Sequence, residues 1–465
     1  MRVYALYTVV AALCVYAWRN WFYSLCGLIV LMAFIQHEDM PKSIGDVQGL
    51  NPWNILLVFV ILSWAVHRRH EGLVWDLPRP VTVLLLLYLG VVLVGFGRMM
   101  VDLKHMGSDS ISTLISEQLI NTVKWVIPGL LLFDGCRTRR RLVVALLALT
   151  VLYSAVALQL AYRLPTSCAI GGGEETQHIR LKITSELGYS TCDMSTMLAG
   201  ASWAFLAFLP LARKNWQKAL IIGGVLLVTY GQALTGGRAG YLAWGAVGLI
   251  MCLVKWRKYL FLAPIVPLLL YVVFPASAER MLEGFSSQNV AGETTTDDYA
   301  VTSGRSLAWP FVIDKIGESP GFGYGREAMV RTGLMGLIQT QYPGENFPHP
   351  HNAYLEWLLD NGIVGLLPLI GFFGFAIYCS ARLFRDGNPY LAAAGGMALA
   401  LLLAQLLGGI GAQHFYPRES ALGMWAALFL MFRAYVERTR STKLAGKQFL
   451  PARRSYPVSR LFVTR

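Results

Sequence analysis

A few arginine and histidine residues stand in short polar motifs of an otherwise apolar chain. Arg238 lies in TGGRAGYLAWG (235–245), Arg305 lies in TSGRSLAW (302–309), and His349 and His351 flank a proline in FPHPHNAY (347–354). Arginine binds anions, phosphate above all, through a charge that it cannot lose. Histidine exchanges a proton near neutral pH. These residue types could therefore hold an anion and move a proton beside it.

Arg238 is expected at the start of a helix, because it follows a very short connection between two apolar runs. A positive side chain near the positive end of a helix dipole is unfavourable unless an anion is present. Gly236 and Gly237 would let backbone amides approach the same anion. The alternative is an arginine that extends to the lipid headgroups and binds nothing.

Arg305 is expected in the first turn of an amphipathic helix. Ser303 is predicted as the N-cap of that helix, and ESPGFGYG (318–325) is predicted to break the chain further on. The alternative role for Arg305 is a structural ion pair.

The two histidines open the third motif. Pro350 restricts His349 to an extended conformation, and His351 is predicted to begin a short surface helix that runs to Leu359. A hydrogen bond to a headgroup would account for one histidine at this place, but less easily for two.

A break is predicted directly after that helix, at Asp360-Asn361-Gly362. Without it, the helix would place Glu356 and Asp360 inside a bilayer, which is costly. The next span is then expected to start at about Ile363.

Two weaker candidates complete the set. Arg180 is basic in an otherwise acidic loop, and His414 and Arg418 lie in AQHFYPRES between the last two apolar runs. A purely structural role is the alternative for each of the three.

Long apolar runs must position these residues. The chain of 465 residues is 55% hydrophobic and 14% charged, against about 25% charged in a soluble domain. The runs are continuous, without in–out alternation, so they predict membrane-spanning helices and not a barrel. We expect 12 or 13 spans, at about 3–17, 20–36, 52–66, 80–98, 118–135, 142–162, 193–212, 219–234, 239–254, 259–275, 362–381, 390–412 and 420–436.

The basic residues predict the orientation of the spans, since Lys and Arg concentrate in cytoplasmic connections. One set of alternating connections holds 25 Lys and Arg against five Asp and Glu, and the other set holds 13 against 22. The first set is expected on the cytoplasmic side. The net charge of +13 is therefore a topology signal and does not indicate a nucleic-acid partner. Only Lys124 is expected within a span.

Two long polar connections then lie on the outer side of the membrane, and all the motifs face that side. Cys168 and Cys192 both fall there; they could form a disulfide or remain two unrelated thiols. The predicted regions are N-terminal spans (1–162), a first outer loop (163–192), central spans with Arg238 (193–275), a large outer loop (276–361), C-terminal spans (362–436) and a basic tail (437–465).

In this arrangement the chain resembles the O-antigen ligase and polymerase superfamily of bacterial envelope glycosyltransferases, over about residues 190–436. Members have many helical spans and a large periplasmic loop before one of the last spans. The motifs that carry the resemblance are Arg238 at the outer start of a span, Ser303 to Arg305 followed by Pro320 to Gly325, and His351 and Asn352 followed by Gly362 and Gly365.

The resemblance implies glycan transfer, without a metal or other cofactor, from an undecaprenyl-diphosphate-linked donor to an acceptor glycan or lipid A–core. The reaction would take place at the periplasmic face of the bacterial inner membrane. Arg238 and Arg305, with Arg180 and Arg418, would bind the diphosphate. His351 would act as the general base, and His349 could exchange roles with it. Asn352 or Tyr354 would orient the sugar.

Two alternatives stay open. The shared motifs do not separate ligation, polymerisation and protein glycosylation. A transporter or flippase of lipid-linked sugars is the rival class; convergence of Lys124, Gln159 and Gln405 on a cavity at the membrane midplane would favour it.

Overall fold

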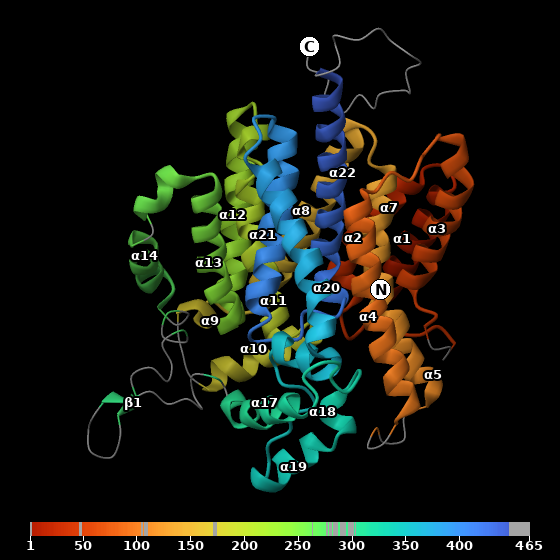
Figure 1. Ribbon diagram of the computed structural model, residues 1–465. Helices are drawn as coiled ribbons and strands as arrows, with labels where there is room; N and C mark the ends of the chain where they lie inside the picture. The colour runs from red at the N-terminus through yellow and green to blue at the C-terminus, as the bar shows by residue number, and fades with distance from the viewer. Residues whose placement is uncertain are drawn as a thin grey trace.

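The computed structural model describes residues 2–45, 49–103, 106, 110–170, 174–262, 264–275, 278, 281, 287–288, 294–295, 302 and 304–445. Long helices form a bundle, and shorter helices gather at the end of the bundle that lies opposite the C-terminus (Figure 1). We call this end of the bundle the loop end. The described strands are β1 (Ser287–Gln288) and β2 (Thr294–Thr295), which form one antiparallel pair.

The long helices follow the predicted apolar runs closely. They are α1 (Arg2–Ala17), α2 (Trp21–Ile35), α3 (Pro52–His70), α4 (Arg79–Val101), α8 (Arg139–Arg163), α11 (Thr191–Leu206), α12 (Asn215–Thr235), α13 (Arg238–Val254), α20 (Ala353–Phe384), α21 (Pro389–Gly408) and α22 (Leu422–Ala445). Among the described residues, six helices are long and apolar enough to cross a membrane, and three shorter ones are also apolar. The predicted class, an all-α polytopic membrane protein, is confirmed.

Helix α21 lies at the centre of the bundle and packs against α11, α20 and α22. Small residues allow this close packing, as is common between membrane helices. A Cβ atom added to Gly395 would lie 2.5 Å from the backbone nitrogen of Phe384 on α20. One added to Gly200 on α11 would lie 3.0 Å from the Cα atom of Leu401.

One predicted span is not a single helix. Where a span was expected at 259–275, the structure has a 3₁₀ turn, η4 (Arg257–Leu262), and the nine-residue helix α14 (Ile265–Val273). Pro264 and Pro267 lack the N–H groups that a continuous helix would need. At about 1.5 Å per residue, α14 alone is too short to cross a hydrocarbon core of about 30 Å.

The fifth predicted span is an irregular helix. It comprises α5 (Ile111–Leu114), the π-helical turn η1 (Ile115–Ile120), α6 (Asn121–Val123), the 3₁₀ turn η2 (Lys124–Val126) and α7 (Ile127–Gly135). The sequence predicts a regular α-helix from residue 118 instead. We call the whole element the irregular helix.

The segments predicted as outer loops lie together at the loop end (Figure 1). They contain α9 (Ser167–Ile170), α10 (Glu174–Glu186), η5 (Arg305–Leu307), α17 (Trp309–Glu318), α18 (Ala328–Arg331) and α19 (Leu334–Gln341). The large loop has a small apolar core of its own, which includes Val312, Met329 and Ile338. The described part of the loop from residue 304 onward is therefore folded and not a linker, as its aromatic content predicts.

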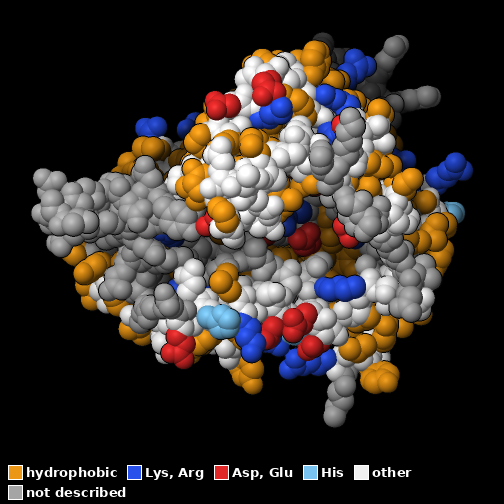
Figure 2. All heavy atoms as spheres, turned by 90° about the horizontal axis from the view of Figure 1, so that it is seen from below, with side chains coloured by type: hydrophobic (Ala, Val, Ile, Leu, Met, Phe, Trp, Pro, Cys, Tyr) orange, Lys and Arg blue, Asp and Glu red, His pale blue; other side chains and the backbone are white. Residues whose placement is uncertain are grey.

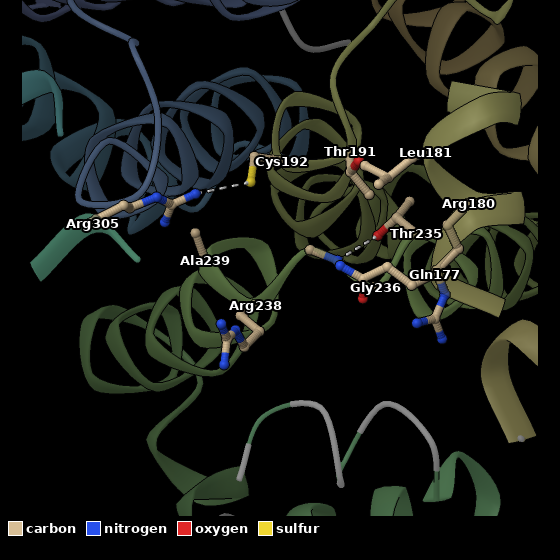
Figure 3. Close-up of a pocket in the computed structure, with 11 residues that line it drawn as sticks. Gln177, Arg180, Leu181, Thr191, Cys192, Thr235, Gly236, Arg238, Ala239 and Arg305 are labelled. Carbon is tan, nitrogen blue, oxygen red and sulfur yellow. Dashed lines mark hydrogen bonds between the residues drawn. The ribbon is translucent and has the colours of Figure 1, made fainter. Parts of the chain in front are cut away.

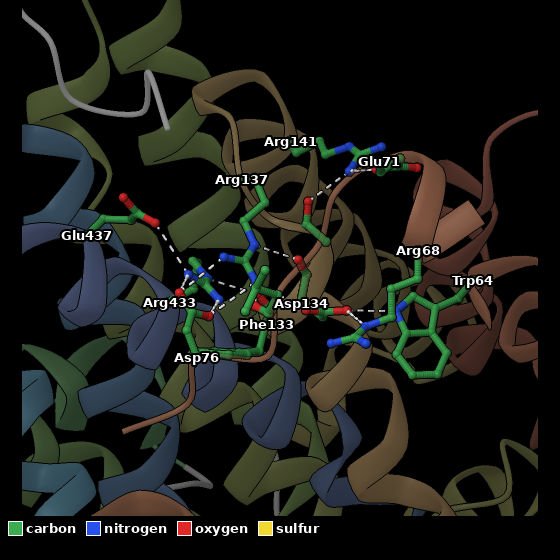
Figure 4. A network of polar contacts seen from close by, with 12 residues as sticks. Trp64, Arg68, Glu71, Asp76, Phe133, Asp134, Arg137, Arg141, Arg433 and Glu437 are labelled. Atoms are coloured by element: carbon green, nitrogen blue, oxygen red, sulfur yellow. Dashed lines mark hydrogen bonds and ion pairs between the residues drawn. The ribbon is translucent and has the colours of Figure 1, made fainter. Parts of the chain in front are cut away.

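The opposite end of the bundle carries the basic residues that predicted the cytoplasmic side. All five acids of that set form ion pairs with arginine, as Figure 4 shows for most of them. Asp76 pairs with Arg433 and Arg137, and Asp134 pairs with Arg137 (3.1 Å) and Arg68 (2.8 Å). The other pairs are Glu71–Arg141 (2.6 Å), Asp386–Arg438 (2.5 Å) and Glu437–Arg433 (3.3 Å).

The predicted break in the third motif is present at Gly362, whose φ of 64° and ψ of −169° are not helical. The large loop supplies the missing hydrogen bonds. The N–H groups of Ile363 and Val364 donate to the carbonyls of Pro320 and Gly321, at 2.9 and 3.0 Å. The break in α20 and the Pro/Gly stretch predicted at 318–325 therefore hold each other in place.

Candidate active site

Three of the four predicted arginines line one cavity of about 170 Å³ at the loop end (Figure 3). Arg180 comes from α10, Arg238 is the first residue of α13, and Arg305 is the first residue of η5. The three lie far apart in the sequence, and no Asp or Glu is among the residues that line the cavity. We call this cavity the arginine pocket. Its walls suit an anion with more than one negative charge.

Arg238 stands where the sequence predicted it, after a two-residue connection. Gly236 has a φ of 72°, which favours glycine, and a Cβ atom on Gly237 would lie 2.6 Å from that of Ser195. The expectation that these two amides face an anion is wrong. The N–H of Gly236 donates to the Tyr241 hydroxyl (2.9 Å), and that of Gly237 donates to Thr235 Oγ1 (3.4 Å). The N–H groups of both glycines are used within the turn. The Arg238 guanidinium is therefore the group of this motif that could bind an anion.

Arg180 is 5% exposed and has a donor to spare. One terminal nitrogen donates to the carbonyl of Cys168, while the buried Nε has no hydrogen-bond partner among the described residues. Gly236 makes room for this side chain, because a Cβ atom there would lie 2.9 Å from Arg180 Nη1. A buried donor without a partner is costly, so the site suits an added acceptor.

Arg305 follows Gly304, whose φ is 80°, and its guanidinium points at Cys192 Sγ, 4.0 Å away (Figure 3). The residue opens a 3₁₀ turn before α17, not the first turn of the helix itself, because Pro310 occupies the beginning of α17. Ser303, the predicted N-cap, lies outside the described residues. All seven cysteines are free thiols, so the alternative of a disulfide between Cys168 and Cys192 does not hold.

The two histidines are packed ring against ring, with centroids 4.0 Å apart. The backbone N–H of His351 donates to Nδ1 of His349 at 3.3 Å, which leaves the proton of a neutral His349 ring on Nε2. The His351 ring makes no hydrogen bond to another described residue. His351 is therefore the freer of the two to accept a proton.

Arginine charges surround the histidine pair. Burial and the charge of Arg305 lower the pKa of His351 to about 4. Burial, His351 and the charges of Arg418, Arg305 and Arg326 lower the pKa of His349 to about 3. Both rings are thus neutral at physiological pH, and Arg305 links the histidine pair to the arginine pocket.

The backbone at His351 is unusual and corrects one prediction. Its φ is 50°, in the left-handed region that few non-glycine residues adopt. The prediction that His351 begins the helix is wrong, because α20 begins at Ala353 and Asn352 is its N-cap. Strained backbone of this kind is frequent at functional sites.

A known protein family matches the part of the chain that contains the Arg238, Arg305 and histidine motifs. Residues 223–370 match the model of a family described as O-antigen ligase. The predicted resemblance to the O-antigen ligase superfamily is confirmed. The matched segment contains Arg238, Arg305 and both histidines, whereas Arg180 and Arg418 lie outside it. We call it the ligase segment.

Curated proteins that are similar to this chain are named as polysaccharide ligases. A protein of Rickettsia conorii named "Putative polysaccharide ligase" is 27% identical over 180 residues, and a similarly named protein of Rickettsia bellii is 26% identical over 182 residues. Each match covers 37% of this chain and 41% of the relative. The chain thus matches about two fifths of each relative's length.

Arg418 is not among the residues that line the arginine pocket. Its guanidinium lies 3.7 Å from Asp193 and donates to the carbonyl of Gln413 at 3.0 Å. His414, the other candidate in this hairpin, contacts Asp193 at 3.2 Å. Asp193 directly follows Cys192 of the pocket wall, so both candidates hold that wall in place. Their positions agree with the structural alternative.

The two residues expected to orient a sugar are occupied in the structure. The Asn352 side chain accepts hydrogen bonds from the backbone N–H groups of Tyr354 (3.0 Å) and Leu355 (3.3 Å). The Tyr354 hydroxyl donates to the carbonyl of Leu406 at 3.0 Å. These contacts fix the start of α20 behind the histidines.

The sequence analysis missed a buried polar cluster within the ligase segment and next to it. The guanidinium of Arg326 lies 3.4 Å from the ring centroid of Tyr416 and 3.7 Å from Glu356. The Tyr416 hydroxyl donates to Asp360 at 2.8 Å and accepts from Asn361 at 2.9 Å. In the sequence, Glu356 and Asp360 served only to predict the break at Gly362, and no local pattern indicated that Arg326 and Tyr416 contact them.

Among the described residues, no three His, Cys, Asp or Glu side chains lie close enough together to hold a metal ion.

Proposed function

We propose that this chain is a membrane glycosyltransferase of the O-antigen ligase type. It would transfer a glycan from an undecaprenyl-diphosphate donor to an acceptor hydroxyl at the periplasmic face of the bacterial inner membrane. The observation that carries the proposal is the arginine pocket. Three arginines from separate segments meet there, with no Asp or Glu among the described residues that line the pocket, and Arg305 also acts on the histidine pair.

In the proposed reaction the acceptor oxygen bonds to the anomeric carbon of the donor glycan. The bond between that carbon and the diphosphate oxygen breaks, and undecaprenyl diphosphate leaves with both bonding electrons. His351 takes the proton of the acceptor hydroxyl. Arg180, Arg238 and Arg305 stabilise the charge on the leaving diphosphate, which is already a good leaving group.

A transporter is less well supported. The three residues whose convergence would favour transport do not meet. Lys124 lines a separate cavity near the start of α3, Gln159 donates to the carbonyl of Ala33 at 2.7 Å, and Gln405 lies beside His414.

Transfer by the purified protein in lipid nanodiscs, from an undecaprenyl-diphosphate glycan, tests the proposal. We expect Arg238→Ala and His351→Ala to lower kcat/KM at least a hundredfold, since removing one stabilising or proton-accepting group costs about that much. Arg238→Lys should also be impaired, because a point charge does not replace the guanidinium fork. Arg257→Ala is the control, because Arg257 is exposed and opens η4, beyond the far end of α13.

Full transfer by both folded alanine variants would refute the site. The envelope of a deletion strain distinguishes the acceptors. Loss of long-chain lipopolysaccharide with accumulation of lipid-linked polymer indicates a ligase. Single repeat units on the core indicate a polymerase, and a loss confined to secreted polymer indicates exopolysaccharide synthesis.

A further inference from the structure

A second cavity, of about 440 Å³, is lined by none of the residues that the proposed reaction uses so far. The connection between α2 and α3, the irregular helix and Glu419 line it. Its volume lies within the range of about 300–1,000 Å³ that is typical of small-molecule sites. The N–H of Glu38 donates to the carbonyl of Glu186 at 2.9 Å, which places this cavity beside the first outer loop at the loop end.

The irregular turns of the irregular helix form one wall of this cavity. Ser116 and Glu117 come from the π-helical turn η1, Asn121 opens α6, and Lys124 and Trp125 come from the 3₁₀ turn η2. A π-helical turn is rare and occurs frequently at functional sites. The π-helical turn η1 and the 3₁₀ turn η2 therefore both place side chains in the wall of this cavity.

Lys124 is the most buried charge of this wall, with 9% of its surface exposed. Its ammonium donates to Asn54 Oδ1 at 3.2 Å and lies 4.4 Å from the ring centroid of Trp125 and 5.6 Å from that of Trp53. Among the described residues, these contacts fix its position but use only one of its three N–H donors on an oxygen atom. The remaining donors suit oxygen atoms of a ligand.

The polar groups of the cavity indicate which ligand would fit. Within the part of the chain that the structure describes, the side chains of Gln36, Ser116, Glu117 and Asn121 make no hydrogen bond. They offer donors and acceptors together, as the hydroxyl groups of a sugar require. Among the described lining residues the charges balance, with Lys42 and Lys124 against Glu117 and Glu419. The arginine pocket has three positive charges and no acid, so it suits phosphate and this cavity suits an uncharged, hydroxyl-rich ligand.

The ion pair of Arg418 and Asp193 connects the walls of the two cavities. Cys192 lines the arginine pocket, and its neighbour Asp193 lies 3.7 Å from Arg418. The next residue, Glu419, lines the second cavity. A ligand in the second cavity would therefore lie beside the wall of the arginine pocket, on the other side of this ion pair.

We propose that the second cavity binds a saccharide and is the acceptor subsite of the transferase. The donor is held by its diphosphate in the arginine pocket, whereas the acceptor needs a site of its own beside it. The assignment to the acceptor rests on the proposed function; the binding of a saccharide does not.

Binding is tested first, on the full chain in nanodiscs. The probe is the core oligosaccharide released by mild acid hydrolysis from the host strain's lipopolysaccharide, observed by saturation-transfer-difference NMR. We expect a signal for the wild type that inorganic pyrophosphate does not displace. Asn121→Leu and Lys124→Met should weaken binding roughly tenfold, the loss expected when one or two hydrogen bonds are removed. Glu117→Gln, on an exposed side chain, tests the same wall without risk to the fold.

Lys182→Met is the matched control, because Lys182 is exposed and lines neither cavity. Absence of a wild-type signal, displacement by pyrophosphate, or unchanged binding by Asn121→Leu and Glu117→Gln together would overturn the saccharide site.

The kinetics of glycan transfer then test whether the bound saccharide is the acceptor. With transfer measured, the variants should raise the KM of the acceptor and leave the KM of the donor unchanged. A rise confined to the donor KM would overturn the acceptor assignment and indicate the donor's glycan chain. If the wild type binds the oligosaccharide but transfers nothing, the proposed function fails while the saccharide site stands.

Discussion

At the scale of single residues, the side chains of Arg180 and His351 keep polar atoms without a hydrogen-bond partner among the described residues. Arg180 is almost fully buried, yet its Nε has no hydrogen-bond partner among the described residues. His351 is held in a left-handed backbone conformation with a ring that accepts no hydrogen bond from them. Both features cost stability in the free protein, and an acceptor bound at Arg180 would offset the first of these costs.

The pKa of His351 predicts an unusual pH dependence. Since burial and Arg305 lower this pKa to about 4, kcat/KM should stay constant down to about pH 5. It should fall as the pH drops through about 4, where the neutral base is lost. A bound diphosphate would offset the charge of Arg305, so the acid limb of kcat should lie at higher pH than that of kcat/KM.

The two pH profiles, measured on the purified protein, check this expectation. Arg305→Gln is the informative variant, because removal of its charge should move the acid limb of kcat/KM upward. A limb near the ordinary histidine value in the wild type, unmoved by Arg305→Gln, would contradict the assigned base.

At the scale of elements, backbone hydrogen bonds join the first part of α20 to the large loop. Tyr324 and Gly325 donate backbone hydrogen bonds to the carbonyls of Leu359 and Asp360, at 2.9 and 2.6 Å. Because Gly362 is not helical, the backbone N–H and C=O groups around it are available for hydrogen bonds to the loop.

Substitution of Gly362 should therefore damage both stability and activity. Its φ is 64°, and a Cβ atom would lie 2.3 Å from the carbonyl oxygen of Gly321. We expect Gly362→Ala to cost at least about 1–3 kcal/mol, the usual cost of such a backbone strain. Gly374→Ala in the same helix has open space around the new atom and should be neutral or slightly stabilising. Thermal unfolding in detergent compares the two; equal melting temperatures would show that the kink is unimportant.

The ion pairs at the opposite end of the bundle connect the ends of distant helices. Burial alone would raise the pKa of Asp76, but its hydrogen bond with Arg433 and the charges of Arg433, Arg137 and Arg440 outweigh burial and lower it. This contribution to stability is therefore present above the pKa that Asp76 has in the unfolded chain, and it is lost as the pH falls through the lowered value.

Asp76→Asn should destabilise the protein by on the order of 3 kcal/mol, because it leaves Arg433, 1% exposed, without its main partner. Asp39→Asn is the matched control, since Asp39 is 56% exposed and pairs with Arg2 at 3.8 Å. Melting temperatures measured above pH 5 test the difference, which should shrink in more acidic buffer. A melting temperature for Asp76→Asn equal to that of the control would contradict this role.

At the scale of the whole molecule, the two ends of the bundle differ in the arrangement of their charged side chains. Figure 2 shows the loop end, where acidic and basic side chains gather around a central hollow. Both cavities lie on this side. The opposite end carries the paired arginines of Figure 4 and the start of the basic tail, whose residues 446–465 lie outside the described part.

Reporter fusions test the orientation of the molecule in the membrane. Alkaline phosphatase fused after Pro343, an exposed residue of the large loop, should be active because the enzyme needs the periplasm to fold. The same reporter after Ala445 should be inactive, and green fluorescent protein there should fluoresce. The reverse pattern would place the arginine pocket in the cytoplasm and exclude the proposed donor geometry.

The sequence by itself determined the helical membrane architecture, because runs of apolar residues and their charged connections carry that information locally. It also determined the break at Gly362, since Asn-Gly is a local turn signal, and it singled out Arg238, Arg305 and the two histidines. It could not separate the roles of His349 and His351, because their tautomers depend on one backbone hydrogen bond.

Only the tertiary structure decided which of these residues meet. Arg180 joined Arg238 and Arg305, while Arg418 paired with Asp193 instead. The cluster of Arg326, Glu356 and Tyr416, and the second cavity around Lys124, were likewise invisible to local patterns. In each case the residues come from elements far apart in the chain, and only helix packing brings them together.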